Sequence, residues 1–278
     1  MFSSFSQNIT NYNPKAFMWV FTTSAKVILP VAFYLSLFFF MMEIINVAIP
    51  KTQGGDSLVF KDISFAFVRW LVALALALTG VIIVVFITLI STGAINLFNS
   101  QGTITDAVLN SFIPRIKLPD NPLGALGELF GMLTNPGKLI GTALSGVLMY
   151  LLCLIGQLVV SISVAVIIYL RFFQLYLMAF FSPIPLVSFA SREFDNIGKT
   201  YLKYVFAYAF QTVVIMAVMW LFSFFAQPTI DLSDALTNFD AGMSDWGNAL
   251  GSLTYMIAYI ALVWQTLSFS KRLFGVGV

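Results

Sequence analysis

Two ionisable residues stand inside long apolar segments of this chain, Glu43 and Arg171. A charged group in hydrocarbon is costly and usually faces a helix bundle or a wet cavity, so both are candidates for a translocation path or for helix packing. They can pair with one another. The alternative places Arg171 in a tight turn at the membrane surface and lets Glu43 reach the interface, where neither has a transport role.

Uncharged polar residues and prolines at similar depth complete this candidate set. Gln174 and Gln211 suit hydrogen bonds between neighbouring helices. Pro183 and Pro185 each remove a backbone donor and clash one turn back. The segment 172–190 is therefore either kinked or re-entrant and covered by other helices, or a proline-terminated span near the interface.

A loop of mixed charge follows the two prolines. Its basic residues Arg192, Lys199 and Lys203 are candidates for docking a cytoplasmic partner, with a solvated turn as the alternative. Gly198-Lys199-Thr200 has the ending of a phosphate-binding loop, but Glu193 occupies the place of the upstream glycine. The loop is therefore not a nucleotide site.

The residue types that intramembrane enzymes need are missing. The chain has no histidine, which excludes histidine-based catalysis and metal ligation, and its one cysteine, Cys153, lies in an apolar run. No aspartate falls within an apolar segment, so paired membrane aspartates are absent as well. We expect a protein without enzymatic activity, metal or cofactor.

The elements that hold these residues are membrane helices. Hydrophobic residues make up 59% of the 278 residues and charged residues only 9%, which is far from the usage of soluble domains. A crossing helix needs about 20 apolar residues. Five apolar intervals meet that length: Val27–Ala48, Trp70–Leu97, Leu139–Ala190, Tyr204–Ala226 and Leu253–Phe269.

The third interval is too long for one crossing. As a single helix it would exceed twice the hydrocarbon thickness, so we expect it to fold back near Arg171 and leave a separate fourth helix broken by Pro183 and Pro185. The predicted fold is an all-α, polytopic transmembrane bundle of about six hydrophobic helices, of which five or six span. Residues 1–26 form an N-terminal interfacial segment and 27–278 the transmembrane domain.

The distribution of Lys and Arg predicts the orientation. The loop 227–251 contains four aspartates and no basic residue, so it should lie outside the cytoplasm. The C-terminus, with Lys271 and Arg272, is then cytoplasmic. Six spans put the N-terminus and the central loop 98–138 inside, whereas five put both outside. The basic residues favour six spans by a small margin.

One stretch resembles a known family. The sequence RFFQLYLMAFFSPIPL from Arg171 to Leu186, followed by Ile197-Gly198-Lys199 and by Ala207-x-x-x-Gln211, resembles the TrbL/VirB-six family, and its Gram-positive versions most. The similarity covers about 60 residues, from roughly Gly156 to Leu221, and includes Tyr201-Leu-Lys203. The arginine, the Pro-x-Pro and the Ile-Gly-Lys turn, in that order, are its most specific part.

Members of that family are polytopic inner-membrane subunits of type IV secretion and conjugation machines. The resemblance implies a channel or scaffold subunit without enzymatic activity, in the cytoplasmic membrane. It implies assembly into oligomers, contacts with other inner-membrane subunits and with the separate ATPases, and transient contact with single-stranded DNA that carries a relaxase. The family is drawn with five spans and an outside N-terminus, which conflicts with the charge count.

Two other functions fit the residues. A secondary transporter for a small solute would use the broken segment around Pro183 and Pro185, although no matched second broken helix is present. A membrane assembly factor of the same machine would need no conduit at all. Substitutions of Arg171 or Gln211 would then leave function intact.

Overall fold

The structure, a computed structural model, is helical throughout the part of the chain that it describes, residues 7–48, 56–100, 136–223 and 239–276. No strand occurs in these ranges, which confirms the all-α class. Five helical segments among them are long and apolar enough to cross a membrane: Pro14–Val47, Gly80–Leu97, Leu158–Phe181, Asp195–Leu221 and Leu253–Leu273. The chain is therefore a multi-pass membrane protein.

The chain divides into two compact units. The first contains Met1–Leu97, Ile168–Val214 and Thr266–Val278, and the second contains Phe98–Ile167 and Ile215–Gln265. All nine predicted site residues fall in the first unit.

The N-terminal helices begin with two asparagine caps. Asn8 precedes α1 (Ile9–Tyr12), and Asn13 precedes α2 (Pro14–Thr23) and accepts a hydrogen bond from the Ala16 N–H. A π-helical turn, Ser24–Ile28, connects α2 directly to α3 (Leu29–Ala48). The helix that begins at Pro14 continues past residue 26 without a break. The position of residues 1–26 at the membrane interface stays a prediction.

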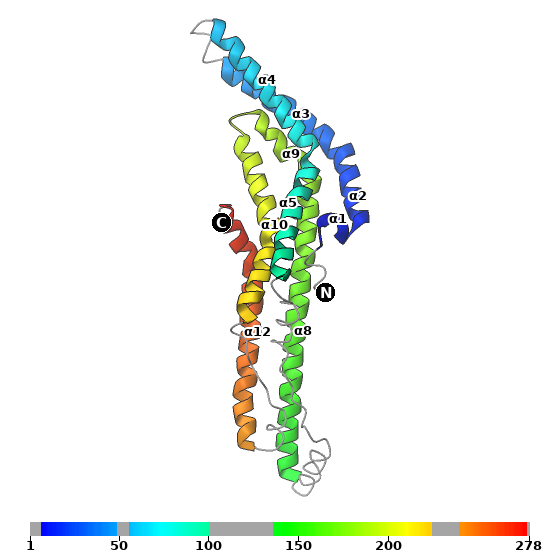
Figure 1. The fold of residues 1–278 in the computed structure, drawn as a ribbon, viewed down its shortest axis with the longest axis vertical. Helices are drawn as coiled ribbons and strands as arrows, with labels where there is room; N and C mark the ends of the chain where they lie inside the picture. The colour runs from blue at the N-terminus through cyan, green and yellow to red at the C-terminus, as the bar shows by residue number, and fades with distance from the viewer. Residues whose placement is uncertain (1–6, 49–55, 101–135, 224–238, 277–278) are drawn as a thin grey trace. The chain divides into compact units, whose positions relative to one another are not determined.

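Helices α3 and α4 (Asp56–Leu78) pack along each other in the first unit (Figure 1). Small residues allow this close approach, because Ala32 on α3 and Ala73 and Ala77 on α4 are buried. Ala32 and Ala77 share a core cluster with Val187 from the segment after Pro185. The pair α3–α4 thus rests on the proline-containing turn.

The predicted span Trp70–Leu97 is divided in two. A turn at Thr79 separates α4 from α5 (Gly80–Ser100). The Thr79 hydroxyl donates to the Ala75 carbonyl at 2.8 Å, and a Cβ on Gly80 would lie only 2.7 Å from Ser182 Oγ. The absence of a side chain at residue 80 lets the start of α5 approach the proline-containing turn.

The predicted fold-back at Arg171 is wrong. Helix α8 runs without interruption from Pro136 to Phe181, and Arg171 lies within it (Figure 1, green). Arginine is a good helix former, and no proline follows Pro136 in this helix until its end. Two hydrogen bonds from the guanidinium to carbonyls of α10 hold Arg171 inside the bundle rather than at a surface turn. Phe172–Ala190 is consequently not a separate fourth helix.

The predicted break at the prolines is confirmed. Helix α8 ends at Phe181, and two short turns follow, α9 (Pro183–Leu186) and the 3₁₀ turn η4 (Val187–Ala190). Pro183 is the first residue of α9, where its missing N–H would be unpaired in any helix. The chain then reverses into α10 (Asp195–Ser223).

The last helix, α12 (Phe239–Leu273), begins earlier than expected. The described part of the predicted acidic loop, 239–251, is helical, so Asp240 and Asp245 belong to α12. The predicted central loop 98–138 is also partly helical, because residues 98–100 belong to the end of α5 and residues 136–138 to the start of α8. The remainder of the two predicted loops, 101–135 and 224–238, lies outside the described residues.

Candidate functional site

Arg171 is buried among three helices of the first unit. Only 2% of the residue is exposed. Its Nε donates to the Tyr208 carbonyl at 3.3 Å and its Nη2 to the Ala209 carbonyl at 3.1 Å, both on α10. The guanidinium carbon lies 5.1 Å from the ring centre of Phe172, within cation–π range. The charge is held by carbonyl dipoles and an aromatic ring rather than by a carboxylate.

Three consecutive carbonyls of α10 collect donors from three other helices. We call Ala207, Tyr208 and Ala209 the α10 carbonyl cluster. Besides the two bonds from Arg171, Ser91 of α5 donates to the Ala209 carbonyl at 2.5 Å, and Ser270 of α12 donates to the Ala207 carbonyl at 2.6 Å. Helices α5, α8 and α12 are therefore all fixed to one turn of α10.

Two polar atoms beside this cluster have no partner among the described residues. They are Nη1 of Arg171 and Oε1 of Gln211, and both are shielded from solvent. Gln211 is 4% exposed and lies two residues after Ala209 on α10. The predicted role of Gln211 in hydrogen bonding between helices is thus not met through its oxygen atom. An unpaired donor and an unpaired acceptor in a bundle both oppose stability.

Glu43 occupies a different environment, near the end of α3. Its Oε2 accepts from the Ser191 hydroxyl at 3.1 Å and from the Arg192 N–H at 2.9 Å. The Arg192 guanidinium Nε lies 3.5 Å from Oε1. Glu43 is 3% exposed, and Ser191 is fully buried. We call this arrangement of Glu43, Ser191 and Arg192 the Glu43 clasp.

The structure does not pair Glu43 with Arg171, which the sequence left open as one possibility. Each is satisfied by groups that lie far away in the sequence, Glu43 by the turn after η4 and Arg171 by α10. The acceptors of Glu43 are met by a backbone N–H, a hydroxyl and the neighbouring Arg192 guanidinium, so the acid does not need Arg171. The two charges therefore belong to two separate sites.

The turn around the Glu43 clasp is bonded internally as well. The Ser188 hydroxyl donates to the Pro185 carbonyl at 2.7 Å and accepts from the Gly198 N–H at 2.9 Å, near the start of α10. Arg69 of α4 donates to the Phe189 carbonyl at 2.9 Å and lies 3.4 Å from Asp195. The turn is thus fixed to both α3 and α4.

The three predicted docking residues do not act alike. Arg192 is engaged with Glu43, and Lys199 pairs with Asp195 one turn earlier at 2.7 Å. Lys203 is exposed and has no carboxylate partner among the residues that the structure describes. Two of the three hold the turn together, and only Lys203 is free for a partner.

Gln174 is half-buried and lies at a groove rather than in the bundle centre. The groove has a volume of about 340 Å³ and is lined on α8 by Gln174, Leu177, Met178 and Phe181, with Pro185, Tyr201 and Tyr208 opposite. Pro185 is half-buried at its edge, while Pro183 is buried. The structure thus brings Gln174 and Pro185 together, separate from Glu43.

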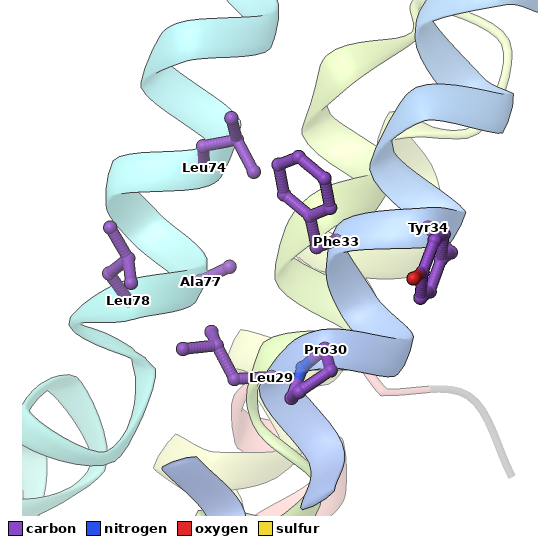
Figure 2. Close-up of a pocket in the computed structure, with 7 residues that line it drawn as sticks. All are labelled: Leu29, Pro30, Phe33, Tyr34, Leu74, Ala77 and Leu78. Atoms are coloured by element: carbon purple, nitrogen blue, oxygen red, sulfur yellow. The ribbon is translucent and has the colours of Figure 1, made fainter. Parts of the chain in front are cut away.

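An apolar pocket lies between α3 and α4 (Figure 2). It measures about 350 Å³ and is lined by Leu29, Pro30, Phe33 and Tyr34 on α3 and by Leu74, Ala77 and Leu78 on α4. Phe33 and Leu74 point toward the space between the two helices, whereas Tyr34 points away from it. The lining offers no group for chemistry, so we do not count it with the candidate sites.

Sequence reasoning missed several residues of these sites. Ser188, Ser191 and Arg69 organise the turn, and Ser91 and Ser270 bind the α10 carbonyl cluster. Serines are common in membrane helices, so residue type alone does not single these out. Arg69 carried a usable signal, because it is a lone cation next to an apolar segment.

Comparison with known proteins identifies no relative. No family model matches the chain, and no curated protein or solved structure matches it either.

Proposed function

We propose that this protein is a non-enzymatic channel or scaffold subunit of a type IV secretion machine, which supports conjugative transfer of single-stranded DNA across the cytoplasmic membrane. Its partners in this role are further copies of itself, other inner-membrane subunits and the ATPases of the machine. Contact with the DNA and its relaxase is transient. The proposal rests on the resemblance to the TrbL/VirB-six family together with the placement of the residues that carry it.

The observation that carries the proposal is the placement of Arg171. It opens the stretch that resembles the family, and its guanidinium is bonded to Tyr208 and Ala209, just before Gln211 at the end of that stretch. The Pro-x-Pro turn and the Ile-Gly-Lys residues, which lie near the start of α10, are likewise joined, through Ser188 and Gly198. The most specific residues of the resemblance thus support one another within a single unit. This favours a scaffold role over independent reactive groups.

The buried arginine suits a subunit whose helices must keep a fixed arrangement while a large substrate passes. A guanidinium presents several donors in a rigid plane, so it fixes both the distance and the rotation of α8 against α10. Polar groups retained in a bundle at a cost in stability are typical of functional positions in membrane proteins. We therefore assign Arg171 a positioning role.

The proposal includes a five-span topology with the N-terminus outside and the C-terminus in the cytoplasm. Five span-capable helices among the described residues and the absence of a helix break at Arg171 support it. Cysteine labelling of Ser3→Cys in a Cys153→Ser background tests it: a membrane-impermeant reagent should label intact cells. Labelling only after lysis would instead indicate six spans.

Gene deletion in a donor cell tests the function. Transconjugants are counted for the donor with its native mobile element, for the deletion strain, and for the deletion complemented with wild type or Arg171→Ala. Transfer should collapse on deletion and return with wild type only. Lys61→Ala, an exposed basic residue on α4, is the matched control and should restore transfer.

The outcomes separate the competing functions. Immunoblots of the membrane fraction establish that each variant accumulates, so that a loss of transfer is not a loss of protein. Undiminished transfer after deletion would contradict the proposal and make solute transport the next function to test. Full transfer with Arg171→Ala would favour an assembly factor without a conduit.

A further inference from the structure

The basic residues of the first unit fall into two groups. Arg69, Arg192 and Lys199 each lie within 4 Å of a carboxylate. Lys203, Lys271 and Arg272 have no such partner among the described residues. Lys15, Lys26 and Lys61 lack a carboxylate partner there as well, but they lie on three different elements, α2, the π-helical turn and α4. Lys203, Lys271 and Arg272 instead come together at the C-terminal end of α12 or beside it. A group of cations without carboxylate partners can bind an anion from outside the chain.

The position of this group along α12 corresponds to a membrane surface. The span-capable part of α12, Leu253–Leu273, has 21 residues, which at about 1.5 Å each equals the thickness of the hydrocarbon core. Lys271 and Arg272 lie in its last turn. They therefore reach the level of the lipid headgroups when this segment spans the membrane.

The end of α12 is held in place by the residues that follow it. Gly275 adopts a left-handed conformation with φ 62°, its N–H bonds to the Arg272 carbonyl, and the Val276 N–H bonds to the Lys271 carbonyl. Phe274 stacks against Phe206 of α10, with ring centres 5.7 Å apart, and Val276 is buried. The cations are thus carried on a fixed helix end.

The side chain of Lys271 is oriented by two tyrosines of α10. Its Nζ lies 5.6 Å from the ring centres of both Tyr204 and Tyr208. Lys203 Nζ also lies at this helix end, 3.9 Å from the position that a Cβ on Gly275 would take. Tyrosine and lysine together are typical of membrane–water interfaces, because each has an apolar body and a polar tip.

From this arrangement we propose that Lys203, Lys271 and Arg272 form a binding site for the headgroup of an anionic phospholipid. The phosphate oxygens accept from the ammonium and guanidinium groups, as charge-assisted hydrogen bonds require. The acyl chains lie against the exposed apolar side chains of the same helix end, Phe269 and Leu273, which are 56% and 61% exposed. These apolar neighbours favour a lipid over free phosphate or nucleic acid. The site goes beyond the proposed transfer role and does not depend on it.

Lipid binding to the purified full-length protein tests the site. The protein in neutral detergent is titrated with phosphatidylglycerol or with phosphatidylcholine of the same acyl chains, and bound lipid is counted by native mass spectrometry. The triple variant Lys203→Gln/Lys271→Gln/Arg272→Gln should retain phosphatidylglycerol roughly ten- to a hundredfold less well than wild type, as expected for three basic groups. The charge-matched control Lys15→Gln/Lys26→Gln/Lys61→Gln removes three exposed cations elsewhere and should bind as wild type does.

Four results would overturn the site. These are equal retention of both lipids by wild type, unchanged phosphatidylglycerol retention in the triple variant, an equal loss in the control, and displacement of the lipid by millimolar inorganic phosphate alone. Binding of a thymidine oligonucleotide through the same three residues, without preference for the anionic lipid, would instead assign the surface to nucleic acid. If the triple variant does not fold, Lys203→Gln and Lys271→Gln are tested singly, and each should lose part of the lipid preference.

Discussion

The Glu43 clasp and the α10 carbonyl cluster bury opposite charges in opposite ways. Glu43 accepts from a hydroxyl and a backbone N–H and lies beside an exposed arginine. Arg171 donates to two helix carbonyls, has a partly unpaired guanidinium, and meets no carboxylate among the described residues. Both carboxylate oxygens of Glu43 have partners, whereas Nη1 of Arg171 has none among the described residues.

This difference predicts opposite responses to removal of the charge. Glu43 is the acceptor that the structure gives to the buried Ser191 hydroxyl and to the Arg192 N–H, so loss of the carboxylate removes the partner of both. The acceptors around Arg171 are carbonyls inside α10, which can still accept from the N–H one turn along the helix. The Glu43 clasp should therefore be needed for stability. Arg171 should be dispensable for stability but needed to hold α8 in its position against α10.

The largest effect is expected for Glu43→Ala. The substitution removes two hydrogen bonds, leaves their donors buried and opens a cavity, so the free energy of unfolding should fall by about 3 kcal/mol. Unfolding is followed by circular dichroism as SDS is added to the protein in neutral detergent. Glu193→Ala is the control, because Glu193 is an exposed acid of the same turn that accepts one surface hydrogen bond, from Asn46 at 3.0 Å. A loss no larger than that of the control would remove the distinction between the two sites.

A smaller effect is expected for Ser188→Ala. The hydroxyl joins the Pro185 carbonyl to the Gly198 N–H, so its removal frees one of the first donors of α10. Loss of such a capping contact costs about 1 kcal/mol. The same titration measures it, with exposed Thr200→Ala as the control. An unchanged unfolding curve would mean that Gly198 is satisfied in another way.

At Arg171 the substitution Arg171→Met should change the free energy of unfolding by less than about 1 kcal/mol, or raise it. Replacing a buried charge by an apolar side chain of similar length is often neutral or stabilising, because the cost of desolvation disappears. Transfer in the conjugation assay should nevertheless fall. A strongly destabilised Arg171→Met would contradict the comparison, since it would make Arg171 as necessary to the fold as Glu43.

The sequence was sufficient for the features that depend on local composition. Apolar length predicted the membrane helices, and the missing donors of Pro183 and Pro185 predicted the break after Phe181. Loop boundaries were less accurate: the polar residues 239–251 suggested a loop but are helical, because helices tolerate polar residues where they leave an apolar environment.

The partners of the two charges could not be predicted, because they depend on contacts across long stretches of sequence. Ser191 lies 148 positions from Glu43, and Ala209 lies 38 positions from Arg171. Opposite charge suggested pairing between Glu43 and Arg171. Backbone groups, which have no sequence signature, and a hydroxyl and a guanidinium from a distant turn meet these charges instead. The same competition explains why Arg171 did not force a turn in α8.

The smallest effect is expected at Gln211. Its Oε1 has no partner, so Gln211→Leu should leave the free energy of unfolding unchanged or raise it by up to about 1 kcal/mol. No hydrogen bond joins this oxygen to the free Nη1 of Arg171, and the effects of Gln211→Leu and Arg171→Met should therefore add within about 0.5 kcal/mol in the double variant. Coupling above about 1 kcal/mol would reveal a bridge between the two atoms. Every nitrogen of the Arg171 guanidinium would then have a partner, as both carboxylate oxygens of Glu43 do, and the contrast between the two sites would be lost.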